Sequence, residues 1–483
     1  MKPLTLSLPL LSLSLITLSL HLLAPTLAQK CHPDDVAGLL GFKALIKEDP
    51  SSMLSSWKPN TDCCKWDGIT CSSLSSMNRV TALSLYGQED DPKSFLSGPI
   101  SFALSKLTYL NGIYLVNLRK ITGAFPSLLF KLPNINYVYI ENCELHGALP
   151  ENIGQLFGLE ALSFSGNKFS GPIPNSISNL TKLTQLKFGR NSLSGEIPAG
   201  IQRLKSLRIL NLEHNMLRGP IPDLSGLTEL LYLELSHNRL IGKIPATISV
   251  HAPLLQFLEL GHNLLTGSIP SFLGNFQKLD TLDLSSNYLT GPVPQSFKNL
   301  TKIFNLDLSE NLLVDPFPAM KVKGIESLKL SHNRFHLGKI PDWVTSSPII
   351  YSLGLAGCGI KMQFEEWKPK DTYFYDYIDL SGNEITGNPA ALLNRTEFLV
   401  GFNVSSNKLS FDLGKVNWPT TLRDLDMSRN MAKGKIPASF AGLSGLNVSY
   451  NHLCGLIPAT KFPASSFLGN DCLCGKPLPP CRK

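Results

Sequence analysis

The stretch Leu279–Pro294, LDTLDLSSNYLTGPVP, decides the fold of this chain. It follows the spacing L-x-x-L-x-L-x-x-N-x-L, in which the asparagine is Asn287. The same position recurs upstream at intervals of 24, 25, 23, 24 and 24 residues, at Asn263, Asn238, Asn215, Asn191 and Asn167. A unit this short cannot bury its own hydrophobic face, so the copies are expected to stack into one continuous solenoid.

Each repeat predicts a strand followed by a turn. In the L-x-L tripeptide the leucines point inward and the intervening residues point outward, because side chains alternate along a strand. The inward asparagine can pair with main-chain groups that the turn would leave unpaired. Cys143 and Cys358 take its place in two repeats and are expected to be buried thiols. The Gly-x-Ile-Pro ending then returns the chain along an extended or short helical path.

The predicted fold is an α/β solenoid, a right-handed leucine-rich-repeat superhelix with a parallel β-sheet on its concave face. About 16 repeats are expected across residues 80–458. Two regions break the rhythm: Asp315 replaces the usual glycine, and residues 362–377 lack the Gly-x-Ile-Pro ending. The aromatic residues of the second region, Trp367, Tyr373 and Phe374, are interpreted as local packing of a misshapen coil, with a binding lip as the alternative.

Residues 1–28 have the features of a secretory signal peptide. An uncharged, leucine-rich run from Pro3 to Leu23 precedes a small-residue cleavage site after Ala28, and a membrane anchor is the alternative. Downstream, no stretch reaches the length of a membrane-spanning helix, so the mature chain is expected to be soluble and extracellular, without a transmembrane segment. Five Asn-x-Ser/Thr sequons are permissive for N-glycans there: Asn179, Asn299, Asn394, Asn403 and Asn447.

The ends of a solenoid expose hydrophobic sections that need capping pieces. Residues 29–79 are the predicted N-terminal cap and residues 459–483 the predicted C-terminal cap, each rich in cysteine, and Trp57 and Trp66 are expected to cover the first coil. The ten cysteines of the chain fit an oxidising compartment. The cysteine spacing alone leaves several pairings open.

The cap carries a family resemblance. The segment CHPDD from Cys31, the run DPSSMLSSWKPNTDCCKWDGITC from Asp49 to Cys71 and the following L-x-G-x-IP repeats resemble the plant extracellular leucine-rich-repeat proteins. Within them the chain is most similar to the polygalacturonase-inhibiting proteins and their relatives. The resemblance implies the disulfides Cys31–Cys63, Cys64–Cys71, Cys454–Cys472 and Cys474–Cys481.

The sequence does not favour an enzyme. It contains no H-E-x-x-H or G-x-S-x-G motif, and no Gly-Lys pair is followed by Ser or Thr, so no catalytic residues, cofactor or metal site are expected. The net charge of +7 is spread over a chain with 17% charged residues and no basic block, which is not typical of nucleic-acid binding. A binding scaffold is the favoured interpretation.

Outward strand positions give the candidate binding surface. Aromatic residues beside charges are typical of protein-binding surfaces, although acidic residues and serine are also common on this kind of sheet. An acidic band about 20 Å long is expected along neighbouring strands, bordered by aromatic residues. The candidate partner-binding residues are Tyr137, Tyr139, Glu213, Tyr232, Glu234, Phe257, Glu259, Asp283 and Asp307.

Two further residue sets have weaker interpretations. Histidines directly precede four of the repeat asparagines and are read as solvated strand ends rather than metal ligands: His214, His237, His262 and His332. Basic residues that directly follow repeat asparagines could bind pectin, a polyanion, but they are three or four coils apart and make no continuous groove: Lys168, Arg239, Arg334 and Lys408.

The resemblance implies a secreted recognition protein of the plant cell wall and apoplast. In that family inhibition works by occluding the enzyme, so the expected partner is a polygalacturonase-like wall-degrading enzyme in plant defence. The alternative is a soluble receptor-like ectodomain that binds a peptide or a membrane receptor kinase in defence or development. The broken coils around Asp315 and Met362–Tyr377 slightly favour that alternative.

Overall fold

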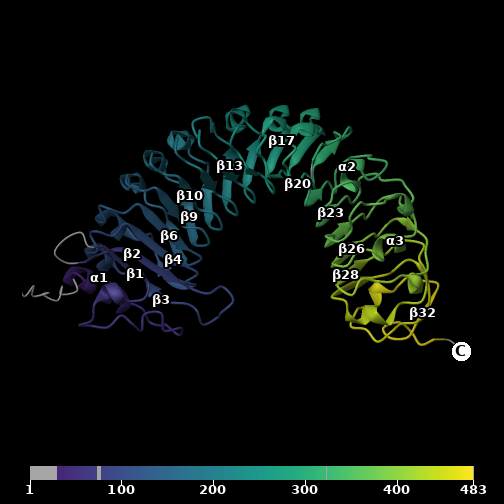
Figure 1. The fold of residues 1–483 in the computed structure, drawn as a ribbon, viewed down its shortest axis with the longest axis horizontal. Helices are drawn as coiled ribbons and strands as arrows, with labels where there is room; N and C mark the ends of the chain where they lie inside the picture. Colours follow the sequence, from purple (N-terminus) through teal and green to yellow (C-terminus); the bar gives the residue numbers. More distant parts are fainter. Residues whose placement is uncertain (1–29, 73–77, 323, 482–483) are drawn as a thin grey trace, which may run out of the picture.

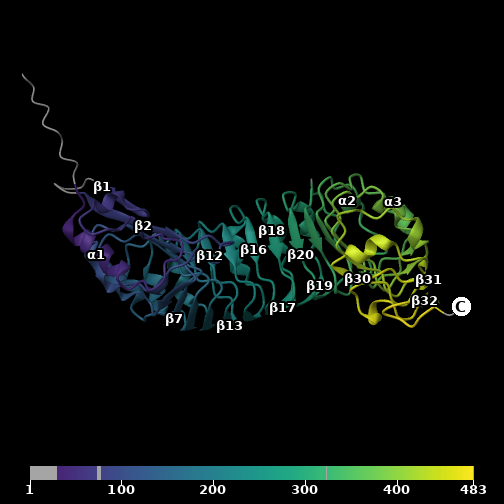
Figure 2. The same cartoon turned by 90° about the horizontal axis from the view of Figure 1, so that it is seen from below.

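The chain forms a curved solenoid in which a parallel β-sheet lines the inner side. The computed structural model describes residues 30–72, 78–322 and 324–481, so the signal peptide expected at residues 1–28 lies outside the described residues. Figures 1 and 2 show an arch, with α1 (Pro33–Lys43) near one end and β32 (Cys472–Cys474) near the other. The predicted fold class, a leucine-rich-repeat solenoid with disulfide-stapled ends, is confirmed.

The inner sheet has 17 strands. The first strand is antiparallel to the second, and every later pairing is parallel. The strands in their spatial order are β1 (Ile69–Ser72), β2 (Arg79–Tyr86), β4 (Gly112–Val116), β6 (Tyr137–Glu141), β8 (Ala161–Ser163), β10 (Gln185–Lys187), β12 (Ile209–Asn211), β14 (Tyr232–Glu234), β16 (Phe257–Glu259), β18 (Thr281–Asp283), β20 (Asn305–Asp307), β22 (Ser327–Lys329), β23 (Ser352–Gly354), β24 (Tyr377–Asp379), β26 (Gly401–Asn403), β28 (Asp424–Asp426) and β30 (Gly445–Asn447). The N-terminal cap supplies β1, and each coil that follows contributes one strand.

A second parallel sheet, of ten strands, was not predicted. It is built from the segment that closes each coil, which from β9 onward directly follows the repeat asparagine. Its strands are β3 (Ser97–Pro99), β5 (Lys120–Gly123), β7 (Glu144–Ala148), β9 (Lys168–Pro172), β11 (Ser192–Gly195), β13 (Met216–Pro220), β15 (Arg239–Gly242), β17 (Leu264–Ser268), β19 (Tyr288–Pro292) and β21 (Leu312–Val314). The glycine of this segment has a left-handed backbone, with φ of 78° at Gly291. The sheet ends at β21, where Asp315 takes that position.

Two smaller parallel sheets continue the flank beyond that break: β25 (Thr386–Gly387) with β27 (Lys408–Leu409), and β29 (Lys433–Gly434) with β31 (His452–Leu456) and β32. Helical turns occupy the outer rim of the arch, as Figure 1 shows. The helical turns are η1 (Cys63–Lys65) in the cap, then η2 (Phe102–Lys106), η3 (Ser127–Lys131), η4 (Ile153–Gln155), η5 (Asn175–Asn179), η6 (Ala199–Arg203), η7 (Ala246–His251), η8 (Ser271–Asn275), η9 (Gln295–Asn299), α2 (Asp342–Thr345), η10 (Phe364–Glu366), α3 (Ala390–Leu393), η11 (Leu413–Lys415), η12 (Ala438–Gly442) and η13 (Ala464–Ser466).

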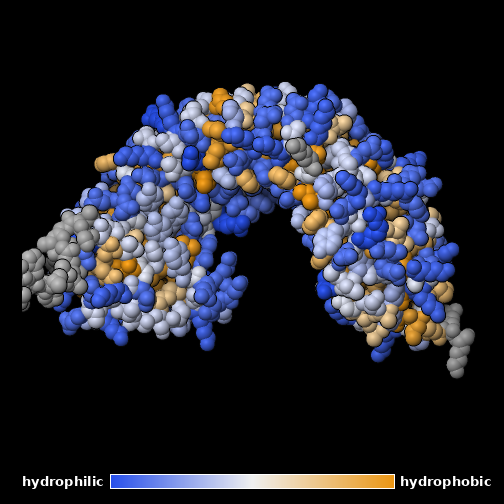
Figure 3. Space-filling model, viewed as in Figure 1, coloured by the Kyte–Doolittle hydropathy of each residue, from blue (hydrophilic) through white to orange (hydrophobic). Residues whose placement is uncertain are grey.

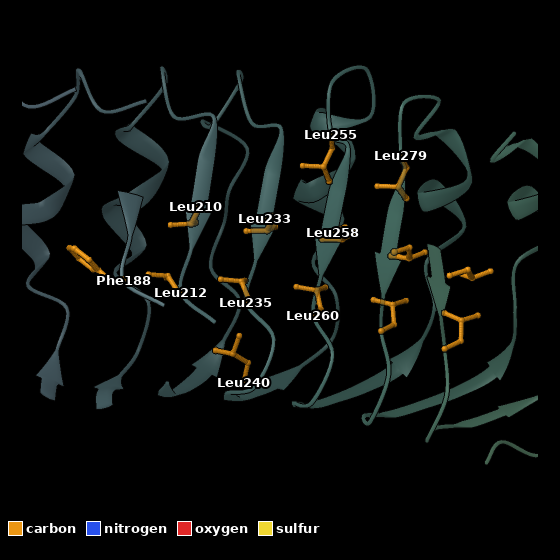
Figure 4. Packing of buried hydrophobic residues seen from close by; sticks show 14 of the residues in the cluster. Phe188, Leu210, Leu212, Leu233, Leu235, Leu240, Leu255, Leu258, Leu260 and Leu279 are labelled. Carbon is orange, nitrogen blue, oxygen red and sulfur yellow. The ribbon is translucent and has the colours of Figure 1, made fainter. Parts of the chain in front are cut away.

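The core is a continuous column of leucines between the two sides. In Figure 4 the inward leucines of successive strands, such as Leu210, Leu233 and Leu258, follow one another along the solenoid, and all three are fully buried. This arrangement buries in each coil the apolar face that a single repeat could not cover. Figure 3 shows mainly polar residues on the flank in view, with apolar residues in small groups.

The repeat asparagine satisfies main-chain groups on two coils. The Asn287 Nδ2 atom donates to the carbonyls of Leu260, Leu284 and Ser285, and its Oδ1 atom accepts from the Leu265 N–H at 2.9 Å. This geometry agrees with the role expected from the sequence. Asn470, which the sequence analysis did not identify as a repeat asparagine, does the same at the end of the array, since its Oδ1 accepts from the Leu453 N–H at 3.0 Å.

The two unpaired cysteines are buried, as expected. Burial raises the pKa of both the Cys143 and the Cys358 thiol to about 12. The Cys143 Sγ atom lies 3.4 Å from the Glu141 carbonyl and 3.7 Å from the Leu115 carbonyl, so the thiol takes over part of the asparagine's role. Both thiols are therefore structural and unreactive in the folded chain.

The N-terminal cap is held by three kinds of contact. Trp57 and Trp66 are buried and stack with centroids 5.6 Å apart. The buried Asp35 carboxylate accepts from the Arg79 guanidinium at 2.9 and 3.0 Å and from the Val80 N–H at 2.8 Å. The disulfides at the two ends are the pairs that the resemblance implies: Cys31–Cys63, Cys64–Cys71, Cys454–Cys472 and Cys474–Cys481.

Within the irregular region, most of the aromatic residues contribute to packing. Trp367 is buried and meets Tyr375 edge to face at a centroid distance of 5.8 Å. Tyr373 is exposed and packs edge to face on Phe398 at 4.7 Å. These contacts favour local packing over a binding lip as the role of Trp367.

Candidate protein-binding surface

The acidic band occupies one row of the inner sheet. In the parallel ladder Glu234 is paired with Glu259, Glu259 with Asp283, and Asp283 with Asp307. Glu213 does not belong to this row, because the ladder partner of Glu234 is Asn211. The prediction of a single five-member band was therefore wrong in this detail, since Glu213 lies two residues beyond Asn211 along the chain.

Basic residues pair with Asp307 at one end of the band and with Glu213, which lies beside its other end. The Lys329 Nζ atom lies 3.4 Å from the Asp307 carboxylate, and the Arg190 Nε atom lies 3.3 Å from the Glu213 carboxylate. The remaining carboxylates of the band form no ion pair within the described part of the chain: Glu234, Glu259 and Asp283. The centre of the band is thus the part that a basic partner could neutralise.

Burial changes the protonation of the central carboxylates. Burial raises the pKa of Glu259 to about 7, and the neighbouring carboxylates Glu234, Asp283 and Glu213 add to the effect. Burial also raises the pKa of Glu234 and of Asp283, although hydrogen bonds from Asn211 and Ser285 oppose the change. The charge of the band therefore grows as the pH rises from acid toward neutral.

An aromatic pair lies beside this band. The rings of Tyr232 and Phe257 stack with centroids 4.7 Å apart and planes 16° apart. Both side chains are half-buried on the inner face, while the adjacent Leu233 and Leu258 are fully buried in the core. The alternation places the pair where the sequence analysis put it, on the outward side of the sheet.

The histidines form a stacked row that the sequence analysis did not anticipate. The ring centroids are 4.0 Å apart between His214 and His237, and 4.1 Å apart between His237 and His262. All three residues have a left-handed backbone, with φ between 48° and 56°, which turns each side chain in the same direction. Burial, together with the neighbouring His262 and His214, lowers the pKa of His237.

The stacked histidines are not among the described residues whose candidate ligand atoms gather in a group of three or more. Among the described residues, the one group of candidate ligand atoms that lie together belongs to Cys31, Cys63, Cys64 and Cys71. Those cysteines are all in disulfides and are therefore not available to a metal ion. The cap cysteines are structural.

A second aromatic group lies nearer the N-terminal end. The Tyr139 ring stacks on Tyr114 at a centroid distance of 5.4 Å, and its hydroxyl donates to Gln185 at 3.1 Å. The Tyr137 hydroxyl donates to the Glu160 carboxylate at 2.5 Å. Both predicted tyrosines are thus half-buried on the inner sheet and fixed by hydrogen bonds, at a place separate from Tyr232.

A recess of about 260 Å³ near the C-terminal end was missed by the sequence analysis. The ring of Tyr377 lies over Gly401, and the carboxylate of Asp424 lies over Gly445, because each glycine leaves room where a side chain would stand. The remaining polar side chains of the recess are Asn403, Asp426 and Asn447. The recess could have been predicted from the sequence, because Gly401 and Gly445 each stand six residues before a repeat asparagine, at an outward strand position.

The basic residues considered for pectin do not line the inner sheet. Lys168, Arg239 and Lys408 begin strands of the flanking sheets β9, β15 and β27. Carboxylates pair with two of them, since the Lys168 Nζ atom is 2.8 Å from Glu144 and the Lys408 Nζ atom is 2.7 Å from Glu384. This arrangement does not favour an anion-binding groove.

Comparison with known proteins defines the class. The leucine-rich-repeat N-terminal domain model matches residues 32–72, and leucine-rich-repeat models match residues 158–180, 206–227, 229–250 and 253–313. These matches agree with the leucine-rich-repeat solenoid fold of the chain. The structure of PEPR1-AtPEP1 superimposes with a TM-score of 0.56 at 25% identity, covering 92% of this chain and 69% of that one. The plant peptide hormone receptor RGFR1, in complex with RGF2, gives a TM-score of 0.53 at 24% identity, covering 82% and 81% of the two chains, and shows the shared fold.

Over part of its length the chain is similar in sequence to plant polygalacturonase inhibitors and to a plant receptor. The chain is 43% identical to polygalacturonase inhibitor 2 of Arabidopsis thaliana over 111 residues, 22% of this chain and 34% of that protein. It is 33% identical to phytosulfokine receptor 1 of the same plant over 126 residues, 26% of this chain and 11% of that protein. The match thus spans about a third of the inhibitor's length. These relatives support a non-enzymatic recognition protein.

The disulfides bear on the compartment in which the chain folds. Four disulfides are typical of proteins that fold in an oxidising compartment. Across the described ranges, none of the helices has both the length and the apolar character needed to traverse a bilayer. The disulfides and the relatives suggest an extracellular location.

Proposed function

We propose that this chain is a secreted recognition protein of the plant cell wall and apoplast that inhibits a polygalacturonase-like enzyme by covering it. The observation that carries the proposal is the Tyr232–Phe257 stack beside carboxylates that have no ion pair in the described chain. The relatives named as polygalacturonase inhibitors support the choice of target class. The proposed partner is a protein, with no nucleic acid, cofactor or metal involved.

The mechanism follows from the chemistry of the surface. The stacked rings present a rigid apolar area, which is the kind of anchor that contributes most to protein interfaces. The carboxylates Glu234, Glu259 and Asp283 attract a basic surface and reject an acidic one. A partner enzyme seated in the concavity would be inhibited because its substrate could no longer reach the active site.

The test is inhibition of a fungal endopolygalacturonase by the purified secreted protein. Tyr232→Ala removes one ring of the stack, which is expected to weaken inhibition about 10-fold or more. Tyr232→Phe keeps the ring and should retain most of the inhibition. The double variant Glu234→Lys with Glu259→Lys reverses the charge and should weaken inhibition further.

The matched control is Tyr288→Ala. Tyr288 is 54% exposed in β19 of the flanking sheet, so its removal takes an aromatic ring from the other side of a neighbouring coil. Inhibition should be unchanged in this variant. If Tyr232→Ala and Tyr288→Ala inhibit equally well, or if several such enzymes are unaffected by the wild-type protein, the proposed inhibition is wrong.

A second candidate function is a soluble receptor-like ectodomain that binds a peptide or a membrane receptor kinase. The recess between Tyr377 and Asn447 favours it, because a small concave site suits a peptide side chain better than a broad enzyme surface. The similarity to phytosulfokine receptor 1 supports the same class. Recovery of a receptor kinase from wall extract, lost in Tyr377→Ala but kept in Tyr232→Ala, would favour this function over inhibition.

A further inference from the structure

We propose that the secreted protein carries N-glycans at Asn179, Asn299 and Asn394 and leaves Asn403 and Asn447 unmodified, so that the inner face stays bare. This inference rests on the secretion included in the proposed function. The five sequons look equivalent in sequence, but the fold separates them into two groups. The separation follows from where each asparagine side chain lies.

The three sequons of the first group lie at the ends of outer-rim helices. Asn179 is the last residue of η5, Asn299 is the last residue of η9, and Asn394 follows α3 directly. All three residues are exposed. A glycan attached there extends into solvent and displaces no contact of the solenoid, as expected for a bulky, solubilising modification.

The second group lies on strands of the inner sheet. Asn403 ends β26 and Asn447 ends β30, and both side chains are half-buried. The Asn447 Nδ2 atom, to which a glycan would be joined, donates to the Asp426 carboxylate at 3.2 Å. Its Oδ1 atom accepts from the Ser449 hydroxyl at 2.8 Å. A sugar on this nitrogen would remove a donor hydrogen and disturb that network.

Asn403 is confined by its neighbours in the ladder. It lies between Asp379 and Asp426, each one strand away, and strands in a sheet are about 4.8 Å apart. The Asn403 Oδ1 atom accepts from the Ser405 N–H at 3.1 Å, which holds the amide against the sheet. A sugar ring joined to this amide has to push aside the flanking carboxylates.

The consequence concerns the recess. Asn403 and Asn447 both line it, so a glycan on either residue would fill the space beside Tyr377. Glycans restricted to the outer rim leave the inner sheet open from Tyr232 to Asn447. The rim then carries the bulk of the solubilising sugar, while the inner face keeps its exposed aromatic and acidic residues.

The experiment is glycopeptide mapping of the full chain secreted from plant cells. Trypsin places each sequon asparagine in a separate peptide, since a Lys or Arg separates every neighbouring pair. Sugar is expected on the peptides of Asn179, Asn299 and Asn394, and the peptides of Asn403 and Asn447 should be recovered unmodified. Glycan on Asn403 or Asn447 overturns this inference but leaves secretion intact. A secreted chain that carries no glycan at any sequon overturns the inference for the rim sites.

Exchanging serine and threonine in the sequons tests whether the place of the asparagine in the fold or the hydroxyl residue of the sequon decides where sugar is attached. The rim sequons all end in threonine and the inner sequons end in serine, so a difference in acceptor quality must be tested. In Thr181→Ser the rim residue Asn179 should still carry sugar, and in Ser405→Thr the secreted protein should still have a bare Asn403. Normal secretion of Ser405→Thr with sugar on Asn403 would show that the fold does not exclude the glycan.

Discussion

Replacing Glu259 with glutamine should stabilise the protein at high pH and not at low pH. Glu259 has an ordinary pKa of 4.5 that burial raises to about 7 in the folded chain. Between these two values the folded state binds the proton more strongly than the unfolded state, so the free energy of unfolding falls as the pH rises through that window. Glu259→Gln removes the ionisable carboxyl, so the free energy of unfolding no longer falls in this pH range on account of residue 259.

The magnitude follows from the difference in pKa. A change from 4.5 to about 7 corresponds to roughly 3 kcal/mol if the group were fully shielded from water. Glu259 is only half-buried, so solvent screening reduces the expected gain at pH 8 to about 1–2 kcal/mol. At pH 4 the wild-type carboxyl is mostly protonated in both states, and the variant should nearly match the wild type.

The assay is urea unfolding at pH 4 and pH 8, with hydrogen exchange of β14, β16 and β18 to report the local free energy of opening. Glu384→Gln is the matched control. Glu384 is exposed, and its hydrogen bond from Lys408 lowers its pKa, so its ionisation does not reduce stability as the pH rises and the control should not reproduce the effect of Glu259→Gln. Parallel pH profiles for wild type and Glu259→Gln would refute the reasoning.

The remaining predictions concern the core and the thiols. Asn287→Ala should cost about 2–4 kcal/mol in local hydrogen exchange, since it leaves several buried main-chain groups unpaired, and Asn287→Cys should cost less because a thiol can accept part of the role. His251 is buried, and burial lowers its pKa, so wild-type stability should fall as the pH drops below about 6.5 while His251→Leu should show less acid sensitivity in urea unfolding. Cys143 should resist iodoacetamide in the native protein and react on unfolding, and rapid alkylation of the native chain would contradict its burial.

Two parts of the structure departed from the sequence interpretation for an identifiable reason. The ten-stranded flanking sheet depends on main-chain pairing between segments about 24 residues apart, which no local pattern encodes. The row of stacked histidines depends on the left-handed backbone at His214, His237 and His262. The sequence showed that these histidines precede repeat asparagines, but it did not show their backbone conformation. In both cases the contact lies between coils rather than within one.

The amino-acid sequence alone determined the repeat period, the inward leucines and asparagines, and the placement of Tyr232 and Phe257 on the outward side of the sheet, because these follow from the alternation of side chains within one coil. Only the tertiary structure decided how closely the outward residues of neighbouring strands pack and how deeply they are buried. The strands pair residues at equal distances from their repeat asparagines, so Glu234 meets Asn211 rather than Glu213, and the ring of Tyr377 fills the space over Gly401. The shared protonation of Glu259 and its neighbours arises from that lateral packing, since burial and like charge act between coils.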